Sequence, residues 1–158
     1  MGAPSVRTPA EDGATWAHVS AVTIDGLSGS GKSTVSRALA QRLRWSYLDT
    51  GACYRALTVA ALDANLVGVG AEHPPSTGLD ALAAAALDVL ELSVDPGLSR
   101  VRLGGVDVTE RIRDDATTRT VSAVSADPQL RTRAVQWQRD QARHAGSCVV
   151  EGRDVGTV

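Results

Sequence analysis

One stretch of the sequence decides the fold, and it reads Gly26-Leu27-Ser28-Gly29-Ser30-Gly31-Lys32-Ser33. It matches the pattern G-x-x-x-x-G-K-[ST], in which glycines let backbone N–H groups close around phosphate oxygens while the lysine reaches the β- and γ-phosphates. Lys32 is the only lysine of the chain, where the other long basic side chains are all arginine. A lysine kept at this one position indicates a chemical requirement, and it predicts a phosphate-binding loop.

The residues on both sides of this loop supply the context that phosphate binding needs. Residues 19–24 read as a short buried strand, and residues 34–43 read as a helix whose N-terminus faces the anion. The alternative is an ordinary Gly/Ser turn between a strand and a helix. Ser33 and Thr34 can likewise be first-turn caps, but beside Lys32 the Ser33 hydroxyl is the expected Mg²⁺ ligand.

Length and composition exclude several classes of protein. The chain has 158 residues, enough for one domain with a hydrophobic core, and a formal net charge of -2. This charge gives no bulk attraction to nucleic acid or to an anionic membrane. No run is apolar and long enough to span a membrane, and the N-terminal residues lack the apolar segment of a secretory signal. We expect residues 1–18 to be a disordered leader of a cytoplasmic protein.

Cysteine and histidine residues give no sign of a metal centre. Cys53 and Cys148 stand far apart in unlike contexts, so we expect each to pack as a small hydrophobic side chain in a reducing compartment. His18, His73 and His144 lack the spacing of zinc ligands, both among themselves and relative to the cysteines. The sequence therefore predicts neither a zinc site nor a disulfide.

Strands and helices alternate through the first part of the chain. Residues 45–49 read as a second strand, after which Asp49 or Thr50 caps a second helix that runs to about Leu66. Strand, helix, strand, helix in this order is the start of a parallel α/β sheet with helices on both faces.

The pattern changes between residues 67 and 125. Residues 67–78 carry glycines and prolines and are expected to form a loop, and residues 79–90 are expected to form an alanine-rich helix. Residues 90–108 then alternate between apolar and polar, with turns at Asp95-Pro96-Gly97 and Gly104-Gly105. This predicts a small antiparallel meander, and we interpret residues 67–125 as a subdomain inserted into a core of residues 19–158.

After the insert the sequence returns to helix and strand. Residues 117–124 read as a helix, and Asp127-Pro128 opens a longer one by an N-cap followed by proline at the first helical position. This helix runs to about His144, and Gly146 follows it. Residues 147–151 read as a further buried strand.

Arginine, threonine and aspartate side chains gather at the edge where ligands of open α/β sheets bind. Thr50 and Arg55 flank the start of the second helix, and Arg153 and Asp154 leave the last strand. For Arg55 a plain solvent-exposed position stays an open alternative.

The long helix adds two more candidates. Arg131 and Gln138 lie seven residues apart and therefore share a face. Together with the strand-end residues they suit a phosphate monoester held by several arginines, with an Asp and a Gln free to contact a base or sugar. Arg131 can instead pair with Asp127 across one helical turn.

Four segments resemble bacterial cytidylate kinase. The first two are Val22-Thr23-Ile24-Asp25-Gly26-Leu27-Ser28-Gly29-Ser30-Gly31-Lys32 and Tyr47-Leu48-Asp49-Thr50-Gly51-Ala52-Cys53-Tyr54-Arg55. The others are Gly104-Gly105-Val106-Asp107-Val108-Thr109 with Ile112-Arg113, and Val150-Glu151-Gly152-Arg153-Asp154-Val155-Gly156-Thr157. Many P-loop proteins share the first segment, whereas the second and fourth are fairly specific to the family.

The resemblance implies a nucleoside monophosphate kinase that phosphorylates CMP, and also dCMP, with ATP and Mg²⁺. The implied fold is a P-loop parallel sheet with helices on both faces and a small antiparallel insert. ATP would bind at Gly26, Leu27, Ser28, Gly29, Ser30, Gly31, Lys32, Ser33 and Thr34, with Mg²⁺ at Ser33. CMP would contact Thr50, Arg55, Arg131, Gln138, Arg153 and Asp154. The implied catalytic residues are Lys32, Arg153 and Asp154.

Family members continue beyond the residues present here, with further strands, an arginine-bearing lid and late residues that hold CMP. The resemblance therefore implies a fold that is incomplete at its C-terminus, in which the first strand exposes an unpaired edge. We expect this chain to be unstable or nearly inactive by itself, and the full-length kinase to be a monomer.

Other functions stay open at this stage. The phosphate-binding loop is compatible with a kinase for another small acceptor, or with a nucleotide-binding fragment that has no catalysis. Residues 148–151 resemble an apolar strand ending in an acid that activates water, which would suit an ATPase. A GTPase is disfavoured, because its Asn-Lys-x-Asp motif needs a second lysine.

Overall fold

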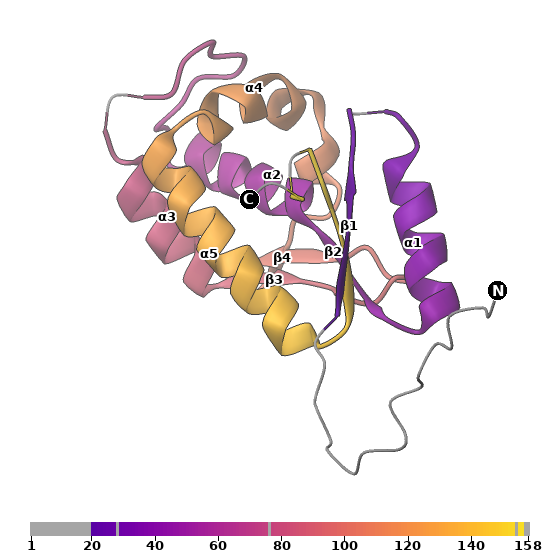
Figure 1. Ribbon diagram of the computed structural model, residues 1–158. Coiled ribbons are helices and arrows are strands. Elements are labelled where there is room, and N and C mark those ends of the chain that lie inside the picture. The colour runs from indigo at the N-terminus through magenta and orange to yellow at the C-terminus, as the bar shows by residue number, and fades with distance from the viewer. Residues whose placement is uncertain (1–19, 28, 76, 154, 157–158) are drawn as a thin grey trace, which may run out of the picture.

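A computed structural model describes residues 20–27, 29–75, 77–153 and 155–156. Figure 1 shows them as two small sheets with helices packed around them. The expected leader of residues 1–18 lies outside the described residues, as do Ser28 and Asp154.

The larger sheet is parallel, and its three strands have the order β1-β6-β2. The strands are β1 (Ala21–Asp25), β2 (Ser46–Asp49) and β6 (Cys148–Gly152). In this register Ile24 of β1 and Asp49 of β2 lie on either side of Glu151 of β6. All three strands therefore bring their C-terminal ends to one edge of the sheet, which is where ligands of open α/β sheets bind.

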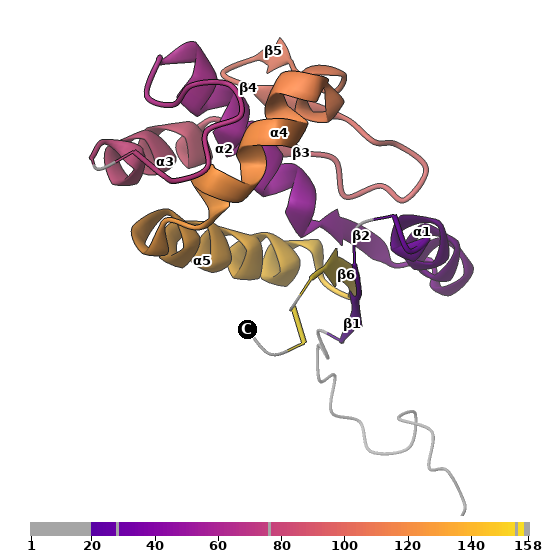
Figure 2. The same cartoon turned by 90° about the horizontal axis from the view of Figure 1, so that it is seen from above.

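Helices cover both faces of this sheet, as the alternation of strands and helices predicts. One face is covered by α1 (Lys32–Leu43), and the other by α2 (Thr50–Asp63) and α5 (Pro128–Ala145), as Figure 2 shows. Among the described residues β1 pairs with β6 alone. In the described part of the chain β1 is therefore an edge strand of this sheet.

The predicted meander forms a separate antiparallel sheet in the order β3-β4-β5. Its strands are short and span Leu90–Leu92 (β3), Val101–Leu103 (β4) and Val106–Asp107 (β5). The loop between β3 and β4 reaches back to the parallel sheet, where the Tyr47 N–H donates to the Val94 carbonyl at 2.8 Å. This hydrogen bond ties the smaller sheet to β2. The boundaries of an inserted subdomain at about 67 and 125 stay a prediction.

Aspartate side chains begin three of the helices. Asp49 accepts a hydrogen bond from a backbone N–H of the first turn of α2 at 3.0 Å, and Asp127 does the same for α5 at 2.8 Å. Asp114 caps α4 (Asp115–Ser125) in the same way. These carboxylates satisfy N–H groups that have no partner within the helix. Of the two caps considered for α2, the structure uses Asp49, and Thr50 is the first helical residue. A further helix is α3 (Leu79–Asp88), and a 3-10 turn lies at Arg111–Arg113.

The second helix ends at Asp63, earlier than the predicted Leu66. Asn65 adopts a φ of 55°, in the left-handed region that asparagine tolerates better than most residues. The Leu66 N–H then donates to the Ala61 carbonyl at 2.9 Å. Such a bond closes a helix C-terminus in the Schellman pattern, so the asparagine marks the true end.

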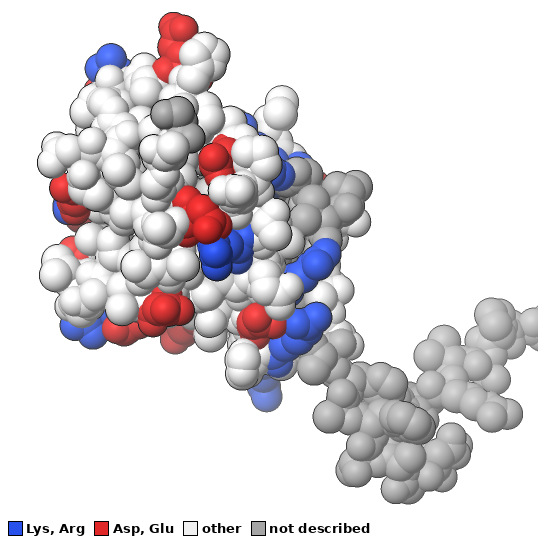
Figure 3. Space-filling model, turned by 90° about the vertical axis from the view of Figure 1, so that its left-hand side faces the viewer, with Lys and Arg blue, Asp and Glu red and all other residues white. Residues whose placement is uncertain are grey.

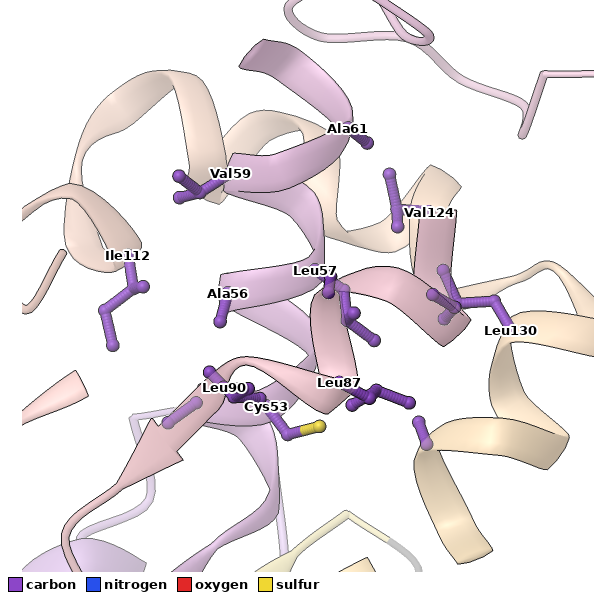
Figure 4. Close-up of a cluster of buried hydrophobic side chains, with 14 of the residues drawn as sticks. Cys53, Ala56, Leu57, Val59, Ala61, Leu87, Leu90, Ile112, Val124 and Leu130 are labelled. Carbon is purple, nitrogen blue, oxygen red and sulfur yellow. The ribbon is translucent and has the colours of Figure 1, made fainter. Parts of the chain in front are cut away.

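The main hydrophobic core surrounds α2, as Figure 4 shows. Cys53 and Leu57 of this helix are fully buried. They belong to one cluster with Leu87 of α3, Val124 of α4 and Leu130 of α5. A helix buried on most of its sides is held rigidly. Because α2 begins at the ligand-binding edge of the sheet, the core fixes the position of the residues at its N-terminus.

Both cysteines pack as small hydrophobic side chains, as the sequence predicts. Cys53 and Cys148 are free thiols and are completely buried. Burial raises the pKa of the Cys53 thiol to about 12 and that of the Cys148 thiol to about 11. Since the thiolate is the reactive form, we expect an aromatic disulfide reagent at pH 8 to label neither cysteine until guanidinium unfolds the chain. Labelling that precedes the unfolding transition would contradict this packing.

Charges are mixed on the face of the molecule that carries α3 and α5 (Figure 3). Acidic and basic side chains are interspersed there, and Arg133 of α5 pairs with Asp80 of α3. The described residues on this face therefore form no extended patch of one sign. In the part of the chain that the structure describes, no helix has both the length and the apolar character that crossing a membrane requires.

Candidate active site

A cavity of about 440 Å³ opens at the carboxyl edge of the parallel sheet. Its lining comes from the loop before α1, the starts of α1 and α2, the end of β6, the segment from Ile112 to Ser125, and Arg131 of α5. Ligand pockets commonly have volumes of about 300–1,000 Å³. The cavity is therefore large enough for a small-molecule substrate, and its lining is rich in arginine and hydroxyl side chains.

The loop before α1 has the backbone that its glycine pattern predicts. Gly29 and Gly31 adopt φ values of 77° and 86°, a region that side-chain-bearing residues rarely enter. Lys32 and Ser33 line the cavity together with Gly29, and the Lys32 ammonium donates to the Leu27 carbonyl at 2.6 Å. The loop therefore supplies a cation and a helix N-terminus to one side of the cavity.

The other predicted loop residues lie further from this cavity. Gly26, Leu27, Ser30, Gly31 and Thr34 are not among its lining residues. Gly26 lies against the stem of Lys32, where an added Cβ would come within 3.1 Å of the lysine Cδ. The backbone at Gly26 therefore packs closely against the lysine side chain.

A buried carboxylate connects the loop to two strands. The Ser33 hydroxyl donates to Glu151 Oε1 at 2.7 Å, and the Tyr47 hydroxyl donates to Glu151 Oε2 at 2.5 Å. Glu151 is only 6% exposed, and it lines the cavity at the end of β6. Both of its oxygens are thus engaged by hydroxyl donors from separate elements.

A second carboxylate, that of Asp49, lies on the strand next to Glu151. Burial raises the pKa of the Asp49 carboxyl above its usual range, and the charge of Glu151 raises it further. Burial also raises the pKa of the Tyr47 hydroxyl, with the charge of Asp49 as the next cause. Two neighbouring acids at the carboxyl edge form a site where a cation would relieve electrostatic repulsion.

These residues fit a magnesium ion. The Ser33 hydroxyl and the Glu151 carboxylate are hard oxygen donors on the wall of one cavity, 2.7 Å from each other. Mg²⁺ prefers such ligands, and it usually takes only one or two from the protein while phosphates and water complete its shell. Within the described residues no group of three or more metal-binding side chains occurs, which is compatible with such a sparse site.

Four arginines line the rest of the cavity: Arg55, Arg113, Arg131 and Arg153. The Arg55 guanidinium donates to the Ile112 carbonyl and to the Thr118 hydroxyl, each at 2.9 Å. Arg55 is therefore half-buried and holds α2 against the segment before α4. These two hydrogen bonds hold the guanidinium at the cavity wall, and its role in binding a ligand stays a prediction.

Arg131 reaches the cavity from α5, and its guanidinium lies over the ring of Tyr54 at 5.9 Å from the ring centre. Tyr54 lines the same cavity. The stacking fixes a planar cation at the cavity wall. Arg131 is thus positioned to meet an anionic ligand.

Thr50 lies at the wall of the cavity, whereas Gln138 does not. Thr50 lines the cavity, but its hydroxyl donates to the Glu151 carbonyl at 2.7 Å and so joins α2 to β6. Gln138 is buried and does not line the cavity, and its amide lies 3.5 Å from the Thr50 carbonyl. Gln138 lies about two helical turns beyond Arg131, where the face that they share has turned into the core. The structure therefore does not place Gln138 in the cavity, and its contact with a base or sugar stays a prediction.

Arg153 follows the last residue of β6, and Gly152, Val155 and Gly156 near it are closely packed. The N–H groups of Val155 and Gly156 donate to the Asp25 carboxylate at 2.9 and 3.0 Å. An added Cβ on Gly152 would come within 2.6 Å of Thr50 Oγ1 and of a Val155 methyl group. Gly152, Val155 and Gly156 are therefore held in place near Arg153. Asp154, the other predicted residue of this segment, lies outside the described residues.

Several residues that line the cavity or contact its lining cannot be recognised as site residues from the sequence alone. Arg113 belongs to a segment quoted for its resemblance, but no periodicity marks its role, and Ser122 and Ser125 look like ordinary polar positions of a helix. Tyr54 likewise has no local pattern that marks it as a site residue. Glu151 was considered only as an acid for activating water, because its two hydroxyl donors are far away in the sequence.

Comparisons with known proteins agree with this geometry. The family model described as Cytidylate kinase matches residues 22–158. The chain is 48% identical over 136 residues to the cytidylate kinase of Corynebacterium glutamicum, an alignment that covers 86% of the chain. It is 49% identical over 138 residues to that of Nocardia farcinica and 50% identical over 137 residues to that of Rhodococcus jostii, with 87% of the chain covered in each case.

The alignments cover only part of these relatives. They include 56% of the Corynebacterium and Nocardia proteins and 57% of the Rhodococcus protein. The chain therefore spans little more than half the length of the curated relatives that it matches.

Proposed function

The chain belongs to the cytidylate kinase family, and we propose that its cavity serves phosphoryl transfer from ATP to CMP, and also to dCMP, yielding ADP and the nucleoside diphosphate. One observation carries this proposal. Lys32 of the glycine-rich loop shares a single cavity with four arginines, which are Arg55, Arg113, Arg131 and Arg153. Such a cavity can hold two phosphate groups from opposite sides.

On the donor side, the loop and Lys32 would bind the triphosphate of ATP. The ammonium, which donates to the Leu27 carbonyl in this structure, would form charge-assisted hydrogen bonds to the β- and γ-phosphates. Ser33 would hold Mg²⁺, with Glu151 beside it, and the ion would neutralise charge on the phosphates.

On the acceptor side, the arginines would bind the phosphate of CMP. Arg131 and Arg55 reach the cavity from two helices that the core packs together, and Arg153 reaches it from the end of β6. Forked guanidinium groups suit a phosphate monoester, because each can donate two hydrogen bonds in one plane. Asp154 would lie beside Arg153, and its contact with the nucleotide stays a prediction.

Catalysis would then rest on position and electrostatics. The acceptor oxygen would be held in line with the γ-phosphate, and the surrounding cations would stabilise charge that spreads over the transferring group. No residue need form a covalent intermediate. We also propose a cytoplasmic location, which the two free thiols support, since thiols persist in reducing compartments.

Acceptor selectivity tests this function. Calorimetric titration of the chain with CMP, UMP, AMP and shikimate should give the tightest binding for CMP. Incubation with ATP and CMP should form CDP only slowly, since we expect this chain to be nearly inactive by itself. If CMP binds no more tightly than the other acceptors, the chain is a P-loop kinase for a different acceptor.

The ATPase alternative has less support. If Glu151 activated water for hydrolysis alone, the four arginines that line the cavity would have no acceptor phosphate to bind. Rapid ATP hydrolysis without any acceptor nucleotide would nevertheless favour the ATPase.

Replacing Arg131 with methionine separates the acceptor side from the donor side. Loss of one charged hydrogen-bonding partner should weaken CMP binding by roughly tenfold and leave the affinity for an ATP analogue unchanged. The matched control is Arg133→Met, which removes an exposed arginine of the same helix that pairs with Asp80. Equal CMP affinity in the two variants would contradict the role assigned to Arg131.

A further inference from the structure

Tyr47 is held on several sides although it is not among the lining residues of the cavity. Its ring is 3% exposed and lies beneath the Arg37 guanidinium, 4.9 Å from the ring centre. Its backbone N–H is fixed by the Val94 carbonyl at 2.8 Å. The phenol hydroxyl therefore has a defined position, and from that position it donates to Glu151 Oε2 at 2.5 Å.

Fixing one oxygen of a carboxylate also fixes the other, because the group is planar. With Oε2 held by Tyr47, Oε1 of Glu151 faces the Ser33 hydroxyl at 2.7 Å. Without the phenol hydroxyl, a nearly buried carboxylate oxygen would lose its donor, and such an oxygen turns toward another partner. The carboxylate would then rotate away from Ser33.

We propose that Tyr47 is a positioning residue for the metal-bound triphosphate, acting through Glu151. The proposal rests on the proposed function, because the ion is expected at Ser33 only with ATP. Tyr47 itself would touch neither nucleotide nor metal. Its contribution is to hold the Glu151 carboxylate in the orientation that serves Ser33 and the ion, as outer partners of metal ligands do elsewhere.

The test compares ATP binding with and without metal in the wild-type chain and in Tyr47→Phe, which removes only the hydroxyl. A fluorescent ATP analogue is titrated into each protein, first with a chelator and then with Mg²⁺. We expect the metal-free affinities to agree within about twofold and the gain in affinity from Mg²⁺ to fall about tenfold in the variant. Paramagnetic resonance of Mn²⁺, which prefers similar oxygen ligands, should show the same loss of ion binding directly.

A second pair of variants separates positioning from a general structural effect. If Tyr47 acts only through Glu151, adding Tyr47→Phe to a Glu151→Gln chain should cause no further loss of the Mg²⁺-dependent gain. The control Thr58→Val removes another buried hydroxyl, one that donates within α2 to the Tyr54 carbonyl at 2.8 Å, and it should leave the gain unchanged.

These experiments distinguish failure of the inference about Tyr47 from failure of the proposed function. An unchanged gain from Mg²⁺ in Tyr47→Phe, or equal losses with and without Glu151→Gln, overturns the inference while the proposed function stands. A wild-type chain that binds no ATP under either condition overturns the proposed function, and the inference falls with it.

Discussion

Replacing Lys32 with alanine should weaken ATP binding by roughly a hundredfold or more. The lysine is the only ammonium side chain of the protein, and it reaches the cavity from the start of α1. Each charge-assisted hydrogen bond to a phosphate is worth about 1.5–3 kcal/mol, and the ammonium can form two. Titration of the chain with a fluorescent ATP analogue measures the loss.

Two controls show that such a loss comes from the lost ammonium. Lys32→Arg keeps the positive charge, but its planar fork does not match the compact ammonium site, so it should not restore binding. The melting temperature should stay close to that of the wild type, because the hydrogen bond from the Lys32 ammonium to the Leu27 carbonyl lies within its own loop. ATP affinity within threefold of the wild type in Lys32→Ala would remove the basis of the proposed function.

Local signals predict much of this fold. The glycine loop and its lysine place a strand before it and a helix after it, and β1 and α1 are found there. The Asp127-Pro128 pair predicts the start of α5, and turn residues predict the antiparallel meander. These features depend on residues adjacent in the sequence, so no knowledge of tertiary packing is needed to find them.

Features that depend on tertiary packing are not predictable in this way. Helical spacing places Gln138 on the face of Arg131, but only the packing of α5 on α2 decides that this face is buried at Gln138. The contacts of Glu151 join it to residues that precede it by 104 and 118 positions. A strand that ends in an acid gives no indication of which hydroxyl groups will meet it.

The sheet register explains why these distant residues meet. Parallel pairing places Asp49 of β2 directly beside Glu151 of β6, and β1 on the other side of β6 leads into the phosphate-binding loop. A shift of the register by one residue would turn the carboxylates to the opposite face of the sheet. The donor side of the cavity therefore depends on β6 being held in place along its whole length.

Replacing Gly152 with alanine should destabilise the protein by displacing the end of β6. Of the described glycines, Gly152 is the one at which an added Cβ comes closest to other atoms. The new Cβ would lie 2.6 Å from Thr50 Oγ1 and 2.6 Å from a Val155 methyl group. Neither neighbour can yield easily, because the Thr50 hydroxyl is bonded to the Glu151 carbonyl and Asp25 holds the segment of Val155. Overpacking of this kind costs about 1–3 kcal/mol of folding free energy, and more where the backbone must move.

Two measurements check the Gly152→Ala result. Denaturant unfolding should show the loss of stability, and CMP should bind more weakly, because Arg153 follows directly on the displaced residue. Gly68→Ala is the matched control, since an added Cβ there meets no atom within 4 Å, and its stability should lie within about 0.5 kcal/mol of the wild type. If the two variants unfold at the same denaturant concentration and bind CMP equally, β6 does not hold Arg153 in the way described, and the acceptor side of the cavity must be organised by other residues.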